Sequence, residues 1–226
     1  MTVPLLVCDR PAPGVARIRF NRPEKRNALS TELRDRTTDA LHALGEDDAV
    51  KIVVLAGAGG SFSAGFDLEE FGIAATDEAF HARLWASSDR YHQALLRFPL
   101  PLLAAVDGAA LGGGFDTAVL CDVRVASDRA SFGHPEIAFG DVVYAPLREL
   151  IGGGPARELC LSGRRIDAAE ARAIGLISSI HPPAELDDAA VALAGRIARS
   201  PREVLQRTKA KFVDRADIAF RRTLEL

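Results

Sequence analysis

The chain has 226 residues, of which 48% are hydrophobic and 26% charged, with a formal net charge of -3. This hydrophobic content can bury the core of one globular domain, so an intrinsically disordered chain is excluded. Nucleic acid is bound through concentrated Lys and Arg, so a net negative charge gives no general reason to expect it as a partner.

The cysteines and the N-terminus bear on the compartment. Cys8, Cys121 and Cys160 are odd in number and widely spaced, without a C-x-x-C pair, so neither a disulfide framework nor a metal site is expected. A reducing, cytoplasmic location fits best. The first residues lack a basic leader and a sustained apolar run. The longest apolar run, 102–106, is too short to span a bilayer, so no membrane partner is expected.

The first half of the chain alternates predicted strands and helices. Residues 16–20 alternate in polarity, as a half-buried strand does. Ser30 is a suitable N-cap for a helix that Gly45 is expected to close. A second long helix is predicted from Asp77 to Phe98, with Pro99 stopping it. Continuous apolar runs at 52–56 and 102–106 are typical of strands covered on both faces.

The second half continues this order and then becomes helical. A short helix is predicted over 116–120 and a strand over 123–126. Asp167 resembles the start of a capping box, for a helix that Gly175 could end before a strand-like stretch at 176–180. The order of elements predicts the α/β class with a mainly parallel sheet. Two more helices follow, the second with a basic face expected to be solvated, formed by Lys209, Lys211, Arg221 and Arg222.

A first glycine break follows the strand at 52–56. Gly65 permits unusual backbone torsions that could turn the next N–H, that of Phe66, out of a regular ladder. Taken alone, the segment is more often an ordinary turn between a strand and a loop. The preceding Gly57-Ala58-Gly59-Gly60 lacks the last glycine of G-x-G-x-x-G.

The second break, Gly112-Gly113-Gly114, follows the strand at 102–106 and leads into a helix. Its backbone can approach a ligand closely, and the helix N-terminus favours an oxyanion. Close packing of a helix on a sheet explains three glycines equally well. No Gly-Lys-Ser/Thr follows either break, so a nucleotide-binding loop is not supported.

Two acids follow these breaks. Asp116 lies two residues after the glycines, and Glu136 lies beyond a strand that includes Ser131 and Phe132. Carboxylates that face a ligand can hold water or exchange a proton with carbon beside an activated carbonyl. The alternatives are a helix N-terminal charge for Asp116 and a surface acid for Glu136. His134 could orient Glu136, but an ordinary hydrogen-bonded histidine is the preferred interpretation.

Together these segments resemble the crotonase superfamily, also called the enoyl-CoA hydratase/isomerase family. The resemblance implies a crotonase-like fold of stacked ββα units that bind acyl-CoA thioesters and stabilise an enolate, usually as homotrimers or homohexamers. It also implies a role in fatty acid metabolism without a cofactor, since coenzyme A enters with the substrate. The matching segments are Asn21-Arg22-Pro23, Asn27-Ala28-Leu29, Phe62 to Leu68, Ala110 to Asp116, Cys121-Asp122 and Phe132 to Ile137.

The resemblance assigns roles residue by residue. The backbone N–H groups of Phe66 and Gly113 match the family's oxyanion hole, whose donors are each typically worth about 3 to 4 kcal/mol to a developing oxyanion. Glu136 would exchange a proton with carbon, and Asp116 would help place water. The matches to the family's substrate and CoA contacts are Lys25, Arg26, Ala28, Ala64, Gly65, Asp67, Leu68 and Gly112.

The chain also departs from the family pattern. Hydratases usually have glutamate at the position of Asp116, and dienoyl-CoA isomerases have a third acid where this chain has Tyr144. The stretch 139–147 is bulkier than the usual glycine-rich segment. We expect a crotonase core at 1–182 and a C-terminal helical region at 183–226 that is short for the family.

These matches and departures support three functions. The leading hypothesis is an enoyl-CoA hydratase, a lyase that adds water to an enoyl-CoA or removes it. Its alternatives are an enoyl- or dienoyl-CoA double-bond isomerase and a non-catalytic acyl-CoA-binding homologue.

Overall fold

The main sheet has six strands. The structure is a computed structural model that describes residues 4–216, 218, 222 and 223. The strands are β1 (Leu6–Ala12), β2 (Val15–Phe20), β3 (Ile52–Gly57), β4 (Leu102–Val106), β6 (Val123–Ser127) and β9 (Ser179–His181). Their spatial order is β1-β2-β3-β4-β6-β9. The first pair is antiparallel and every later pair is parallel, which confirms the mainly parallel sheet.

A second, smaller sheet leads into the second glycine break and into the segment that contains Glu136. It contains β5 (Ala109–Leu111), β7 (Ser131–Gly133) and β8 (Ile166–Asp167), in the order β5-β7-β8. Strand β5 follows β4 after two residues, so the chain passes directly from the large sheet to the small one. Parallel pairing of β5 with β7 brings Leu111 opposite Gly133.

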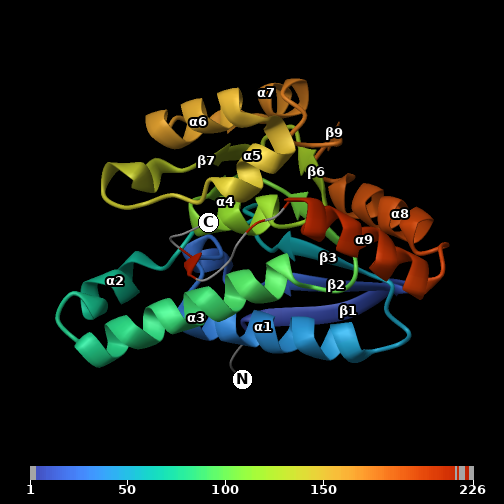
Figure 1. Cartoon of the computed structure of the whole chain (residues 1–226), viewed down its shortest axis with the longest axis horizontal. Helices are drawn as coiled ribbons and strands as arrows, with labels where there is room; N and C mark the ends of the chain where they lie inside the picture. Colours follow the sequence, from blue (N-terminus) through green and yellow to red (C-terminus); the bar gives the residue numbers. More distant parts are fainter. Residues whose placement is uncertain (1–3, 217, 219–221, 224–226) are drawn as a thin grey trace.

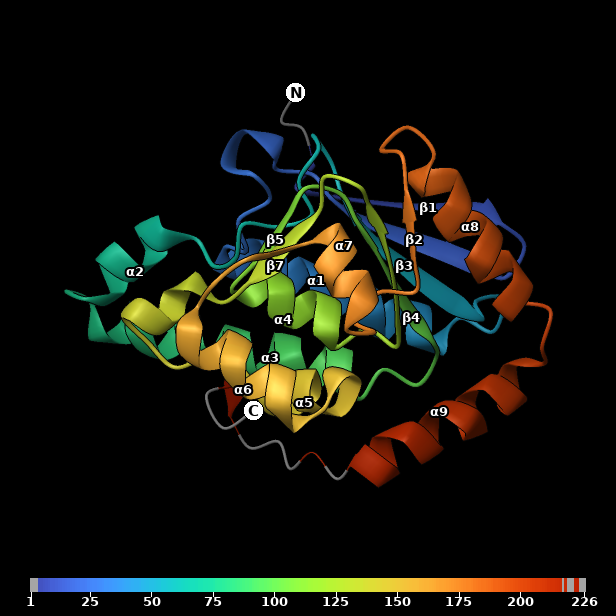
Figure 2. The same ribbon diagram turned by 90° about the horizontal axis from the view of Figure 1, so that it is seen from above.

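Nine α-helices and two short 3-10 helices are found in the described residues. Helices α1 and α3 run side by side below the sheet in Figure 1, and α5, α6 and α7 lie across the top. Figure 2 shows α8 beside the strands and α9 along an outer edge. The helices are α1 (Thr31–Glu46), α2 (Leu68–Ala74), α3 (Glu78–Leu96), α4 (Gly113–Val119), α5 (Ala145–Ile151), α6 (Gly153–Ser162), α7 (Ala168–Ala173), α8 (Leu186–Ile197), α9 (Arg202–Ala216), η1 (Pro23–Lys25) and η2 (Pro135–Ala138).

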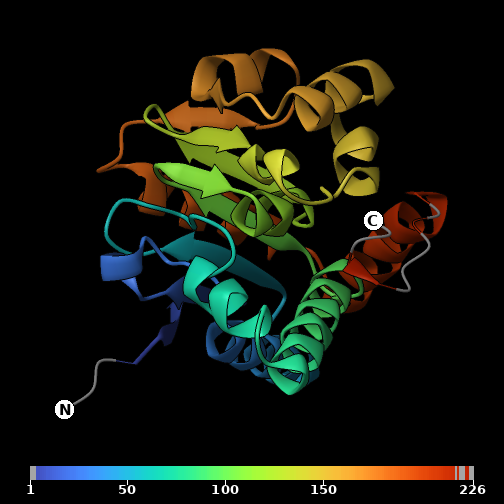
Figure 3. The same cartoon turned by 90° about the vertical axis from the view of Figure 1, so that its left-hand side faces the viewer.

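The central strands β3 and β4 of the main sheet are buried on both faces. On β3, Val53 and Leu55 belong to the larger core cluster, while Ile52 and Val54 belong to a second cluster with the α8 residues Ala190 and Ala194. Successive side chains of a strand point to opposite faces, so a continuous apolar run is required here. The side view in Figure 3 shows α2 and α3 on one side of the strands and α5 to α7 on the other.

Most predicted helix starts are confirmed, because the capping side chains act locally. Ser30, Asp77 and Asp167 each accept a hydrogen bond from the backbone three residues ahead. Four predicted bounds shift. Helix α1 continues past Gly45 to Glu46, and α3 ends at Leu96 before Phe98. The helix predicted over 116–120 is α4, which spans Gly113–Val119, and the strand predicted over 176–180 begins only at Ser179. Its first residues, Leu176 and Ile177, are buried without strand pairing.

The predicted solvated basic face of α9 is wrong at Lys209. Its ammonium group is buried, donates to the carbonyl oxygen of Leu100 at 2.9 Å, and lies 2.8 Å from Asp122 Oδ2. A buried lysine is retained when its charge is paired in this way. Lys211 and Arg222 are exposed, as expected, and Arg221 lies outside the described residues.

All three cysteines are free, with Cys121 and Cys160 buried and Cys8 exposed. No helix in the described part of the chain has the length and apolar character needed to cross a bilayer. The predicted boundary between residues 182 and 183 falls between β9 and α8, and the division into two domains stays a prediction.

Candidate active site

The two glycine breaks lie side by side. Ser63 pairs with Ala110 as a short parallel bridge, and the N–H of Leu111 donates to the carbonyl of Ser63 at 3.1 Å. Gly65 has a φ of 95°, and a methyl group added there would lie 2.7 Å from the carbonyl oxygen of Leu111 and 3.4 Å from the nitrogen of Gly113. Only glycine permits this approach of the two backbones.

Two backbone N–H groups are left free where the breaks meet. Leu29 donates to the carbonyl of Gly65 at 2.8 Å, which fixes the peptide before Phe66. Gly113 is the first residue of α4, where a helix leaves its N–H groups without internal partners. Within the described residues, the N–H groups of Phe66 and Gly113 donate to no other group. This pair can therefore bind an oxyanion.

Two acids and a histidine adjoin this pair. Asp116 projects from the first turn of α4 and is 5% exposed, while Glu136 lies on η2 with its side chain 21% exposed. His134 lies between them, with Nε2 3.3 Å from Asp116 Oδ1 and Nδ1 4.0 Å from Glu136 Oε1. From the sequence we predicted that these acids lie near the glycines, and the fold brings both acids to the cavity that Gly112 and Gly113 line.

The environment of Glu136 favours its protonated form. Burial raises the pKa of its carboxyl to about 8, and the nearby Asp116 adds to the rise. Burial also lowers the pKa of His134, opposed by the charge of Asp116. Glu136 can thus hold a proton near neutral pH and release it to a substrate atom, as a general acid does.

Unpartnered polar atoms are concentrated at this site. Of the six buried side-chain nitrogen or oxygen atoms that lack a hydrogen-bond partner among the described residues, five belong to His92, Asp116, His134 and Glu136. Both ring nitrogens of His134 are among them, so the expectation of an ordinary hydrogen-bonded histidine is wrong. Burial of unpartnered polar atoms is costly, so their accumulation marks a site that is completed by a ligand.

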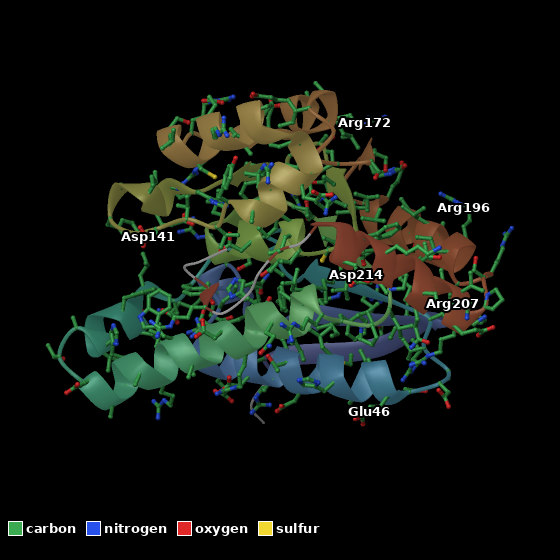
Figure 4. All side chains as sticks on the ribbon, viewed as in Figure 1. Glu46, Asp141, Arg172, Arg196, Arg207 and Asp214 are labelled. Atoms are coloured by element: carbon green, nitrogen blue, oxygen red, sulfur yellow. The ribbon has the colours of Figure 1, made fainter. Side chains whose placement is uncertain are left out.

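A cavity of about 440 Å³ opens onto these groups. Its apolar part comes from α2, α3 and the segment 139–143. Asp141 of this segment lies on the loop before α5, on the side of the molecule where α2 is found (Figure 4). The lining residues are Ala64, Gly65, Phe66, Leu68, Phe71, Trp85, Gly112, Gly113, Asp116, Pro135, Glu136, Phe139, Gly140, Asp141, Val143 and Thr223.

The residues matched to CoA contacts divide into two groups. Ala64, Gly65, Leu68 and Gly112 line the cavity, and Leu68 is 69% exposed. The exposed Arg26, the exposed Lys25, which pairs with Glu69, and the half-buried Ala28 lie outside the lining. Their role toward CoA stays a prediction.

Asp67 is engaged within the protein. Its carboxylate pairs with Arg22 at 2.6 Å and accepts from the N–H of Glu69 at the start of α2. These contacts account for its burial, so Asp67 supports the loop that carries Phe66. A direct contact with CoA stays a prediction for this residue.

Several residues at the site were not identified from the sequence, among them Trp85, His92 and Arg34. Trp85 lines the cavity from α3, and His92 on the same helix lies 3.8 Å from Asp116. Arg34 of α1 is fully buried, with its guanidinium 4.4 Å from the centre of the Phe66 ring. Polar residues on the buried stripe of α3, at Ser88 and His92, were the available signal.

Comparison with known proteins identifies the family. The family model for enoyl-CoA hydratase/isomerase matches residues 11–226. The chain belongs to this family. The predicted membership of the crotonase superfamily is therefore confirmed.

Two relatives of this chain are named for different activities. It is 36% identical over 219 residues to "Probable enoyl-CoA hydratase EchA12" of Mycobacterium tuberculosis, covering 92% of this chain and 76% of the relative. It is 38% identical over 196 residues to 4-chlorobenzoyl coenzyme A dehalogenase-2 of an Arthrobacter species, covering 83% and 70%. These relatives support an acyl-CoA enzyme and leave the reaction to be argued from the site.

Solved structures confirm the crotonase fold. An enoyl-CoA hydratase/isomerase from Xanthobacter autotrophicus superimposes with a TM-score of 0.87 at 30% identity, over 95% of this chain and 80% of that one. An enoyl-CoA hydratase from Bacillus anthracis gives a TM-score of 0.83 at 30% identity, over 94% and 89%.

Proposed function

We propose that the protein is an enoyl-CoA hydratase that adds water across the α,β double bond of an enoyl-CoA thioester. The observation that carries this proposal is the convergence of two free N–H groups, from Phe66 and Gly113, with the carboxyl groups of Asp116 and Glu136 on one cavity. Hydration needs these groups: donors for the thioester oxygen, a group that activates water and an acid that protonates carbon.

The two acids act in opposite directions in the proposed reaction. Asp116 accepts a proton from water as the water oxygen bonds to C3. The electron pair of the double bond moves toward the thioester oxygen, where the N–H groups of Phe66 and Gly113 stabilise the enolate. Glu136, whose raised pKa keeps it protonated, then gives its proton to C2. A proton returned from Asp116 through solvent restores Glu136.

The proposal extends to partners. The acyl-CoA thioester brings coenzyme A as part of the substrate, so no separate cofactor is required. By family resemblance we also propose assembly as a homotrimer or homohexamer and a role in fatty acid metabolism. The cytoplasmic location predicted from the cysteines stays a prediction.

The test is hydration of a panel of 2-enoyl-CoA thioesters of different chain length. Purified wild-type protein should consume at least one of them, and Glu136→Gln should lower kcat by about 100-fold or more because it removes the proton donor. Glu149→Gln, an exposed acid on α5, is the matched control and should retain activity. Wild-type protein that hydrates no member of the panel would contradict the proposal.

A double-bond isomerase is the second candidate. Asp141 is a third acid that lines the cavity, although the position matched to the third acid of dienoyl-CoA isomerases is Tyr144. Product analysis on 3-enoyl and dienoyl thioesters distinguishes the two reactions, since an isomerase returns an isomer of unchanged mass. Tight CoA binding without turnover on either panel would instead favour a non-catalytic homologue.

A further inference from the structure

His92 approaches Asp116 from helix α3. It is fully buried, and its Nε2 lies 3.8 Å from Asp116 Oδ2. In the described part of the chain this nitrogen has no hydrogen-bond partner. A buried imidazole with one ring nitrogen unpartnered and directed at a carboxylate needs a chemical explanation.

The other ring nitrogen fixes the tautomer. His92 Nδ1 lies 2.9 Å from the backbone oxygen of Ser88, and a carbonyl oxygen can only accept. An unprotonated Nδ1 would set two lone pairs against each other at this distance. Nδ1 therefore carries the proton of the neutral ring and donates it to Ser88.

The C-terminal segment supports the same tautomer. The hydroxyl of Thr223 donates to Asp89 Oδ1 at 2.9 Å, so its oxygen is left to accept, and it lies 3.3 Å from His92 Nδ1. The N–H of Thr223 also donates to Asp89, which fixes the position of this residue. The carbonyl of Ser88 and the hydroxyl oxygen of Thr223 thus both face Nδ1 as acceptors, which leaves Nε2 of the neutral ring as a bare acceptor.

A bare Nε2 facing a carboxylate stabilises one protonation state of the pair. While Asp116 is ionised, two acceptors face each other without a proton between them. Once Asp116 takes a proton, its O–H can donate to Nε2 after a closure of about 1 Å to ordinary hydrogen-bond length. An interaction that forms only after proton transfer favours the transition state over the resting state. Catalytic hydrogen bonds are often long until the substrate is bound.

We infer that His92 is a positioning residue that makes Asp116 the general base of the reaction, and this inference rests on the proposed hydratase function. Water loses a proton to Asp116 Oδ2 as its oxygen bonds to C3. The new O–H of Asp116 is held by His92 Nε2 while the enolate electrons take a proton from Glu136 at C2. His134, beside Asp116 Oδ1, contacts the opposite oxygen of the same carboxylate.

The kinetic test separates activation of water from chemistry at C2. Exchange of the C2 hydrogens of a saturated acyl-CoA in D2O needs Glu136 and the two N–H groups, whereas hydration also needs Asp116 and His92. His92→Asn keeps a donor near the Nδ1 position but has no atom at Nε2, so hydration should fall by about 100-fold while C2 exchange continues near the wild-type rate. KM should change little, because His92 does not line the cavity.

Two further variants sharpen the result. His92→Gln can place its amide oxygen near the Nε2 position and should recover part of the hydration lost in His92→Asn. His42→Asn, at an exposed position of α1, is the matched control and should hydrate like wild type. If hydration and exchange fall together in His92→Asn, or if hydration is retained, the inference is wrong.

Long-range ¹H–¹⁵N spectra of the histidine rings test the inference in the wild-type protein. This measurement needs no substitution, so it does not depend on whether a variant folds. The Nδ1–H neutral tautomer is expected for His92, and an imidazolium or an Nε2–H tautomer at the working pH would overturn the inference. Failure of the proposed function has a different signature: wild-type protein exchanges the C2 hydrogens yet hydrates no enoyl-CoA. That result also rejects a role for His92 in activating water.

Discussion

The carboxyl group of Glu136 lies against the Cα of Gly112, so that a methyl group there would come within 3.1 Å of Oε2 and 3.3 Å of the carboxyl carbon. Gly112 also has φ 52° and ψ -130°, a conformation that side chains disfavour. Gly112→Ala should therefore lower the free energy of unfolding by about 1–3 kcal/mol and displace the Glu136 carboxyl. Chemical denaturation and the rate of C2 exchange measure the two effects separately.

Gly154→Ala is the control for this substitution. Gly154 lies in α6, where a methyl group would meet nothing within 4 Å, and alanine favours a helix. Activity should be unchanged and stability equal or higher. Unchanged exchange in Gly112→Ala would show that the contact with Glu136 does not position the acid.

The pH dependence of turnover should depend on the reaction direction. Glu136 must be protonated to give a proton to C2, and its pKa is raised to about 8, so kcat/KM for hydration should fall as pH rises through about 8. Dehydration of a 3-hydroxyacyl-CoA needs the ionised form, and its kcat/KM should rise through the same range. Glu149→Gln should share both wild-type profiles. A kcat/KM for hydration that increases above pH 8 would show that a group other than Glu136 donates the proton.

The same acid should leave a signature in stability. Its folded pKa of about 8 exceeds the ordinary value of 4.5, so between these values the folded state holds a proton that the unfolded state has lost. The free energy of unfolding should therefore fall as pH rises through this window, by up to about 1.4 kcal/mol per pH unit from this group. Denaturant unfolding at several pH values measures the slope.

Glu136→Gln isolates this contribution to stability. His134 acts in the opposite direction, because its pKa is lowered from the ordinary value of 6.5, so the unfolded state is the one that binds more protons as pH falls through that value. The contribution of His134 is common to both proteins, so it cancels in the difference between their free energies of unfolding. That difference should contain only the contribution of Glu136, which falls as pH rises. A flat difference across pH 4.5 to 8 would show that Glu136 ionises normally.

The sequence was sufficient where a local pattern decides the structure. Ser30 and Asp77 cap helices through bonds to residues three ahead, and the run 52–56 is continuous because both faces of β3 are covered. The glycines at 65 and 112 indicated unusual backbone before any contact was known. Their convergence with Glu136 was expected from the family resemblance, because a local sequence pattern does not show which distant loops contact each other.

What the sequence did not reveal depends on contacts between distant segments. Strand β5 has three residues and β8 two, too few for any periodicity to be detected. His92 lies in a helix whose apolar stripe was predicted, but its unpartnered nitrogen is apparent only when α4 brings Asp116 beside it. Lys209 was expected in solvent because its partners, Leu100 and Asp122, lie more than 80 residues earlier in the chain.

Arg34 should position the oxyanion hole through Phe66. Its buried guanidinium donates to the carbonyls of Leu29 at 2.9 Å and Leu84 at 3.2 Å, and it lies over the Phe66 ring. Leu29 in turn pairs with Phe66. Arg34→Lys keeps the charge but loses the planar fork, so one buried acceptor is left unpaired and stability should fall by about 1–3 kcal/mol.

The loss should also reach catalysis, because a backbone donor displaced by even 1 Å binds the oxyanion less well. C2 exchange in Arg34→Lys should fall by about 10-fold under conditions where the variant is fully folded. Arg36→Lys is the control. Arg36 lies two residues further along α1, and its exposed side chain pairs with Glu32, so this variant should match wild type in both stability and exchange rate. If Arg34→Lys loses stability while exchange stays at the wild-type rate, the position of Phe66 does not depend on the guanidinium.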